Sequence, residues 1–426
     1  MMKAYWHDYS TILKDELMTA LGCTEPICIA YCSAVMREAL AAEPEKIHVS
    51  CSGNLVKNAK GATVPNSGGM KGIAASAVLG AVGGDASKKL ELLTGITAEQ
   101  ISRARELLDE GICETSLIGK DCDNLQVVVR GEADGHFAEA ELKHTHTNIT
   151  RILRDGEVLY SGENHAEEKA DEPEAPAQKL SIKKIIDYCE NMDLDEEGIR
   201  EVLEHQIRCN SAISEEGLKN NWGASVGQVI LSQDQSLRAK AVASAAAGSD
   251  ARMSGCELPV VINSGSGNQG ITVTMPVIRY AEALGKSRDD LLRALALSNL
   301  VAIHIKSAYG RLSAFCGAVS AATGAGAAIT WMYGGDYDRI CATIVNTLGT
   351  ISGMVCDGAK PSCASKIASA VDCAIMAHLM AMNSRQFQSG DGLVKKDVES
   401  TIQSIGRMAS EGMVATDQKI LELMME

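Results

Sequence analysis

Residues 239–253 read AKAVASAAAGSDARM, and residues 317–331 read GAVSAATGAGAAITW. Alanine, glycine and serine dominate both stretches, and most of residues 180–426 combines this composition with a helical pattern. Small side chains let the backbones of neighbouring helices approach one another closely. The second half of the chain is therefore predicted to be a tightly packed helical bundle.

Residues 46–162 have a different pattern. Segments that alternate or favour β-branched residues predict strands, and they read KIHVSCSGN, LQVVVRGE, HFAEAELKHTH and EVLYSG. Between them, residues 97–110 have helical periodicity behind Thr97, with Gln100 placed to complete a capping box. We expect an α-rich fold, in which a mainly helical domain (residues 1–45 and 180–426) carries a smaller inserted α+β subdomain (residues 46–162). Residues 163–179, rich in Pro, Ala and Glu, are expected to form a linker or an exposed loop.

The charge balance narrows the range of partners. Lys and Arg number 40 against 55 Asp and Glu, a formal net charge of -15, so nucleic acid is not an expected partner. The N-terminal sequence MMKAYWHDYSTILKDEL lacks the apolar core of a signal peptide. The uncharged run at residues 312–335 is built from small rather than strongly apolar residues, which favours a buried helix over a membrane span. We predict a cytoplasmic protein without a membrane partner.

The chain has fourteen cysteines, which are expected to be reduced thiols in the cytoplasm, with some of them ligands or catalysts. Cys23 lies in GCTEP beside a predicted helix start, where backbone N–H groups stabilise a thiolate, although a buried structural cysteine would look the same. Cys316 and Cys356 lie forty positions apart, and Cys363 follows seven further on. This spacing matches neither a zinc ribbon nor a ferredoxin, but three separated loops can still hold an iron–sulfur cluster.

Five segments resemble the L-cysteine desulfidase family, which is related to the α-chain of iron–sulfur L-serine dehydratases. They are GCTEP (22–26), NLVKNAKGATVPNSGGMKG (54–72), NSGSGNQG (263–270), AYGRLSAFCGAVSAATGAG (308–326) and VCDGAKPSCASKI (355–367). The similarity extends over nearly the whole chain. It implies that the helical domain is catalytic and converts L-cysteine to hydrogen sulfide, ammonia and pyruvate without pyridoxal phosphate.

The resemblance also implies a [4Fe–4S] cluster held by Cys23, Cys316 and Cys356, with the fourth iron open to substrate. Serine dehydratases place a further cysteine at a wider spacing than the one between Cys356 and Cys363, so Cys363 is kept as the alternative to Cys356. Two other functions stay open: an L-serine dehydratase with the same cluster chemistry, and a non-catalytic protein that binds a small ligand. A homodimer is considered, and the oligomeric state is left open.

The proposed reaction also requires groups that bind the carboxylate and the ammonium of the substrate. Consecutive backbone N–H groups in glycine-rich turns can bind the substrate carboxylate. The residues proposed for this role form two sets, Asn66, Ser67, Gly68 and Gly69, and Ser264, Gly265, Ser266, Gly267 and Asn268. Glu25 is expected to bind the substrate ammonium group, or to interact only with a helix dipole.

A base must remove the α-proton of the substrate. Lys57, Lys71 and Lys306 are candidates, and Lys306 ranks first because it precedes Cys316 on the helical stretch AIHIKSAYG, with His304 as a competitor. His144 and His146 alternate on a predicted strand, and without a third ligand they are expected to be a surface pair rather than a zinc site.

Overall fold

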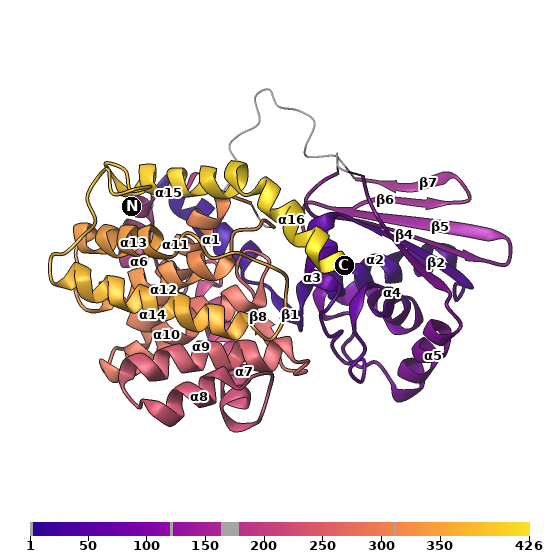
Figure 1. Cartoon of the computed structure of the whole chain (residues 1–426), viewed down its shortest axis with the longest axis horizontal. Helices are drawn as coiled ribbons and strands as arrows, with labels where there is room; N and C mark the ends of the chain where they lie inside the picture. The colour runs from indigo at the N-terminus through magenta and orange to yellow at the C-terminus, as the bar shows by residue number, and fades with distance from the viewer. Residues whose placement is uncertain (1–2, 120–121, 163–178, 311) are drawn as a thin grey trace.

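The computed structural model describes residues 3–119, 122–162, 179–310 and 312–426 (Figure 1). The chain is α-rich with a smaller α+β part, which confirms the predicted fold class. The predicted linker at residues 163–179 lies, apart from Lys179, outside the described residues.

The larger unit is helical. Its elements are α1 (Ala4–Glu16), α6 (Ile182–Asn191), α7 (Ile199–Lys219), α8 (Val226–Gln233), α9 (Leu237–Met253), α10 (Gly267–Ala283), α11 (Arg288–Ser307), α12 (Gly317–Met332), α13 (Tyr337–Ile351), α14 (Cys363–Met382), α15 (Val398–Arg407), the π-turn η3 (Met408–Gly412) and α16 (Val414–Met425). Two short antiparallel strands, β1 (Thr19–Leu21) and β8 (Pro259–Val261), lie at its edge beside the smaller unit (Figure 1).

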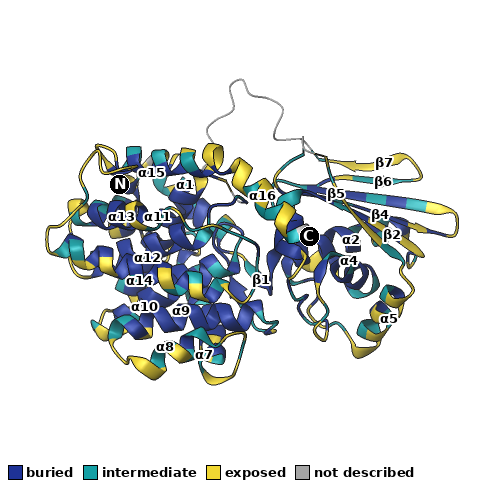
Figure 2. Ribbon diagram, viewed as in Figure 1, coloured by how far each residue is buried: buried dark blue, intermediate teal, exposed yellow. Residues whose placement is uncertain are grey.

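The two stretches that predicted the bundle are α9 and α12, and both are buried almost throughout. A Cβ atom added to Gly324 on α12 would lie 2.2 Å from the carbonyl oxygen of Ser298 on α11. The backbones of α11 and α12 therefore touch, as the small-residue composition predicted. The uncharged run at 312–335 forms α12 in the core of this bundle (Figure 2). One helix of the described residues, α14, is long and apolar enough to cross a membrane, and half of its apolar window is buried.

The smaller unit is a sheet covered by helices on one face. Its elements are α2 (Thr24–Leu40), β2 (Lys46–Cys51), α3 (Gly53–Ala59), α4 (Gly72–Gly83), the 3-10 helix η1 (Ala86–Glu91), α5 (Ala98–Asp109), β3 (Cys113–Leu117), β4 (Gln126–Ala133), β5 (His136–Lys143), β6 (Ile149–Arg154) and β7 (Glu157–Ser161). The strand order is β3-β2-β4-β5-β6-β7, with β2 and β3 parallel and every other pair antiparallel. The capping box of Thr97 and Gln100 is present at the start of α5, as predicted.

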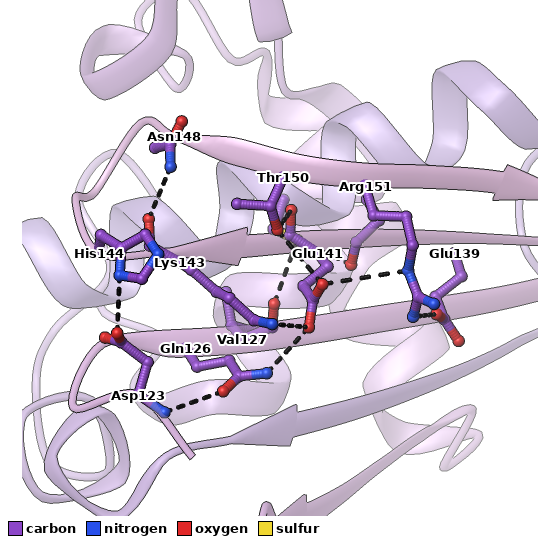
Figure 3. Close-up of polar contacts among 12 residues, drawn as sticks. Asp123, Gln126, Val127, Glu139, Glu141, Lys143, His144, Asn148, Thr150 and Arg151 are labelled. Atoms are coloured by element: carbon purple, nitrogen blue, oxygen red, sulfur yellow. Dashed lines mark hydrogen bonds and ion pairs between the residues drawn. The ribbon is translucent and has the colours of Figure 1, made fainter. Parts of the chain in front are cut away.

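Apolar and polar side chains alternate along β4 and β5, so one face of this sheet is apolar and the other is polar. Val127 and Val129 on β4 and Ala140 on β5 are buried, and α2 packs across both of these strands while α4 packs on β2 and β3. Figure 1 shows the helices on this face of the sheet. On the other face Glu141 accepts a hydrogen bond from Gln126 and pairs with Lys143 at 3.2 Å, within a polar network that includes Thr150 and Arg151 (Figure 3). A sheet with one apolar and one polar face needs helices on one side only.

Helix α2 belongs to this smaller unit by its contacts. It packs along α4 and across β4 and β5, whereas α1 contacts α6, α7 and α11 of the bundle. Because the chain passes from one unit to the other between β1 and α2, we propose that the α+β unit begins near Cys23 instead of at Lys46. The GCTEP segment therefore lies at the junction of the two units.

Candidate active site

One cavity lies where the two units meet. Its volume of about 90 Å³ is several times the ~10–15 Å³ that a single water needs. Both units contribute to its wall, which contains four cysteines and four charged side chains, namely Cys23, Cys316, Cys356, Cys363, Glu25, Arg252, Lys306 and Lys366. All four cysteines that the sequence singled out for a cluster therefore line the same cavity.

Backbone hydrogen bonds hold two of these cysteines side by side. The N–H of Cys316 donates to the carbonyl of Met354 at 3.0 Å, and the N–H of Cys356 donates to the carbonyl of Ala314 at 2.6 Å. Phe315 and Val355 form an isolated antiparallel bridge between the same segments. This short ladder explains how residues forty positions apart reach one wall of the cavity.

Helix starts surround the cavity. Cys23 is the N-cap of α2, Cys316 is the N-cap of α12, Ser266 is the N-cap of α10, and Cys363 is the first residue of α14. None of these four helices has a side-chain hydrogen bond at its N-cap. The first N–H groups of a helix and the positive end of its dipole favour anions, including thiolates and carboxylates.

Burial nevertheless favours the protonated form of three of these thiols, Cys23, Cys316 and Cys363. Burial, followed by the proximity of Cys356, raises the pKa of Cys316 to about 12. Burial also raises the pKa of Cys363, and burial together with the Glu25 carboxylate raises that of Cys23 well above its ordinary value. Metal binding to these sulfurs must therefore displace protons.

The donor set fits an iron–sulfur cluster better than a single ion. No group of three or more His, Cys, Asp or Glu side chains in the described part of the chain could hold one metal ion. Ligands of one ion must converge on a point, whereas each iron of a cluster takes its own thiolate, so cluster sulfurs are more widely spaced. Four soft sulfur donors beside Arg252 and Lys366 suit an anionic cluster.

The loop between Cys356 and Cys363 is fixed by a charged cluster. Asp357 forms ion pairs with Lys360 and Lys366, and Lys366 also donates to the carbonyl of Val355 at 2.9 Å. Although burial raises the pKa of Asp357, hydrogen bonds from the two lysines leave it below its ordinary value. The loop that presents both cysteines is therefore anchored at its centre.

Glu25 faces the cavity from the α+β unit. Its Oε2 accepts hydrogen bonds from the Sγ of Cys23 and the Oγ1 of Thr24, both at 3.1 Å, and the Nε2 of His146 lies 3.9 Å from its Oε1. Burial raises the pKa of this carboxyl, but His146 and Cys23 outweigh burial and lower it to about 2. Glu25 is thus an ionised carboxylate, as binding of an ammonium group requires.

The expectation that His144 and His146 form a surface pair was wrong for His146. Both residues lie in the turn between β5 and β6 instead of on a strand, and His144 has a positive φ of 68°. The turn directs His146 inward, where it is 4% exposed, while His144 pairs with Asp123 at 2.7 Å (Figure 3).

The candidate bases are separated by the structure. Lys306 is buried and lines the cavity, with its Nζ 4.3 Å from the centre of the Tyr309 ring. Lys71 is exposed and is not part of the cavity wall. Lys57 is buried but pairs with Asp417 of α16, and His304 pairs with Glu399 at 2.7 Å. Lys306 is therefore the candidate that the cavity contains.

The two glycine-rich sets are separated in the same way. Ser266 and Asn268 line the cavity, whereas Ser264, Gly265 and Gly267 are buried in the turn that leads into α10. Asn66, Ser67, Gly68 and Gly69 do not line it; they form a turn on the α+β unit, in which Gly68 and Gly69 are exposed.

The sequence did not indicate the place of two cationic residues of the cavity wall, Arg252 and Lys366, or of His146 beside Glu25. Arg252 is one of two cationic residues in the small-residue stretch 239–253, and this isolation was the available signal. Lys366 has no local pattern that distinguishes it, and the alternation of His146 with His144 pointed to the surface, because the position of each depends on the partner that the fold brings to it.

Comparison with known proteins agrees with the sequence motifs. The serine dehydratase alpha chain family matches residues 87–422. The UPF0597 protein of Finegoldia magna is 49% identical over 422 residues, which cover 98% of this chain and 99% of the relative. The UPF0597 proteins of Lachnoclostridium phytofermentans (48% over 417 residues, 97% and 98%) and Treponema denticola (44% over 430 residues, 100% and 99%) are similar over comparable lengths. These matches support a lyase-type enzyme with an iron–sulfur cluster, and the chain belongs to the serine dehydratase alpha chain family.

Proposed function

We propose that this protein is an L-cysteine desulfidase that eliminates sulfide from L-cysteine and yields hydrogen sulfide, ammonia and pyruvate. One observation carries the proposal: cysteines from residue 23 to residue 363 line a single cavity together with a buried lysine, Lys306. Sulfur donors for a cluster and a candidate base for the substrate therefore face the same small space. Pyridoxal phosphate has no part in this proposal, and we place the reaction in the cytoplasm.

Three of the four cysteines would hold the [4Fe–4S] cluster. The sequence favours Cys23, Cys316 and Cys356, with Cys363 as the alternative. Two observations favour Cys363 in place of Cys23: Cys363 lies near Cys316 and Cys356 on the cavity wall, and the family match includes Cys363 but begins after Cys23. When bound, a cluster with one iron free of protein sulfur supplies a Lewis acid for the leaving group.

The side chains of this cavity have complementary roles in the proposal. Glu25 holds the substrate ammonium, and the start of α10 at Ser266 lies beside the carboxylate. The neutral amine of Lys306 takes the α-proton, the electron pair of the Cα–H bond forms the Cα–Cβ double bond, and the bond from Cβ to sulfur breaks with its pair on sulfur, which leaves as hydrosulfide and is released as hydrogen sulfide after protonation. The resulting aminoacrylate hydrolyses through its imine to pyruvate and ammonia without further help from the protein.

L-Serine dehydratase is the second candidate, and the description of the matching family favours it. The same residues would act on a hydroxyl leaving group in place of a thiol. Anaerobically purified protein with its cluster intact should release pyruvate from L-cysteine, with one sulfide per pyruvate, faster than from L-serine. If L-serine is turned over faster than L-cysteine, the assigned activity becomes L-serine dehydratase. If iron-replete protein turns over neither amino acid, a non-catalytic ligand-binding protein is favoured.

A further inference from the structure

Arg252 is a buried cation that makes no direct ion pair in the described part of the chain, although the Glu25 carboxylate interacts with it electrostatically. It lies at the C-terminal end of α9, is 4% exposed and lines the cavity. Among the described residues, its side chain makes no hydrogen bond or ion pair, and its Nε is buried without a hydrogen-bond partner. An unpaired buried charge is costly, so a site that maintains one is suited to an anion that binds there.

The surroundings of Arg252 position it for a carboxylate. A Cβ atom added to Gly267 would lie 2.3 Å from the Nε of Arg252, so the guanidinium packs directly on the first residue of α10. The N-cap of this helix, Ser266, lines the cavity and makes no capping hydrogen bond with its side chain. A carboxylate at this point would meet the planar guanidinium and the free N–H groups of a helix start together.

A second buried atom has the opposite hydrogen-bonding character. The Oδ1 of Asn268, which also lines the cavity, is buried without a donor. The Glu25 carboxyl group lies on the same cavity wall. The cavity therefore offers a cationic donor for one end of a ligand and acceptors for the other, which matches the zwitterionic head of an α-amino acid.

We propose that Arg252 binds the α-carboxylate of the substrate and determines its specificity for amino acids over simple amines, while Asn268 and Glu25 accept from the ammonium group. This inference rests on the proposed function, because it assigns the substrate contacts of the same site. It explains why Gly267 adjoins the guanidinium: any larger residue would displace Arg252.

The test uses the holoenzyme, a R252Q variant and a matched control, R238Q. Arg238 lies on the same helix but is part-exposed and pairs with Asp372. The probes are L-alanine, which has no leaving group, propionate, which keeps only the carboxylate, and ethylamine, which keeps only the amine. R252Q should weaken binding of L-alanine and propionate by about 10–100-fold, the range expected for lost charge-assisted hydrogen bonds, and leave ethylamine unchanged. R238Q should bind all three as the wild type does.

Two further readouts separate this role from a structural one. Removing an unpaired buried charge should leave the melting temperature unchanged or raise it, whereas loss of a structural arginine would lower it. Propionate affinity equal to the wild type in R252Q would overturn the inference, as would loss of iron from R252Q without any change in propionate affinity, which would assign Arg252 to the cluster sulfurs. If the wild type turns over neither L-cysteine nor L-serine but binds propionate through Arg252, the proposed function fails and the carboxylate site stands.

Discussion

Two glycine-rich turns that look alike in sequence have different surroundings in the fold. The turn at residues 66–69 is stabilised locally: Asn66 donates to the carbonyl of Leu93 at 3.0 Å, and the carbonyl of Gly68 accepts from Arg105 at 2.7 Å. The turn at residues 264–268 leads into α10 at the junction of the two units, where Ser266 and Asn268 line the cavity. A glycine pattern therefore predicts a turn, but the elements that pack around the turn determine whether it contacts a ligand.

The lysines near the two turns should differ most. Lys306 shares the cavity with Ser266 and Asn268, and Lys71 follows the first turn at the surface. Replacing Lys306 by Ala should lower kcat by about 10²–10⁴-fold, because general base catalysis is lost, while Lys71→Ala should leave kcat within about twofold. Steady-state kinetics with equal iron content in both variants check this, and a Lys306→Ala enzyme with normal kcat would remove Lys306 from the mechanism.

The glycines of the two turns should differ in their effect on KM. Gly267→Ala should raise KM about 10–100-fold, because the new Cβ would lie 2.3 Å from the Nε of Arg252 and displace the guanidinium; it should lower stability as well, because the Cγ2 of the buried Val260 lies 2.7 Å from the same Cβ. Gly69→Ala should lower stability by about 1–2 kcal/mol and leave KM unchanged, because φ is +90° there and the space around it is open. Thermal unfolding and kinetics of both variants test the pair, and equal effects on KM would erase the distinction between the turns.

Replacing the asparagines of the two turns should change KM by less than replacing the glycines. Asn268→Ala should raise KM about 5–30-fold, since it removes the unpartnered acceptor Oδ1 from the cavity. Asn66→Ala should instead cost about 1–2 kcal/mol of stability, because it removes the hydrogen bond to Leu93 at a residue with φ of 55°. A larger KM change in Asn66→Ala than in Asn268→Ala would place substrate at the first turn.

His146 should have the smallest effect on turnover. Replacing it by Gln removes the imidazole that adjoins Glu25, and we expect kcat/KM to fall about 3–10-fold through poorer orientation of that carboxylate. The matched variant, His144→Gln, alters a pair with Asp123 away from the cavity and should have wild-type kinetics. Identical kinetics of the two variants would exclude a link between His146 and the site.

Local pattern predicted a good part of this molecule. The small residues of α9 and α12 and the alternation of β4 and β5 predicted the two kinds of architecture, because each pattern directly reflects what a helix or a sheet face can pack against. The assignment of α2 to the smaller unit could not be predicted in this way, since a helix that is apolar on most sides does not reveal its neighbours.

The sequence indicated the cysteines of the candidate site, but it did not indicate the arginine and the histidine. Cys316 and Cys356 were singled out because the segments around them resemble the L-cysteine desulfidase family, and the fold places both on the wall of one cavity. Arg252 and His146 were missed because arginine and histidine occur throughout a surface, and only the tertiary contacts with Gly267 and Glu25 distinguish them.

Iron and acid-labile sulfide per chain, measured on anaerobically purified variants, test the central claim that distant cysteines share one cluster. Wild-type protein should contain about four of each, and Cys316→Ala, Cys356→Ala and Cys363→Ala should lose them. Cys23→Ala should keep the cluster, as should the control Cys28→Ala, which alters a buried thiol outside the cavity wall. Full iron and sulfide in Cys316→Ala would contradict the account.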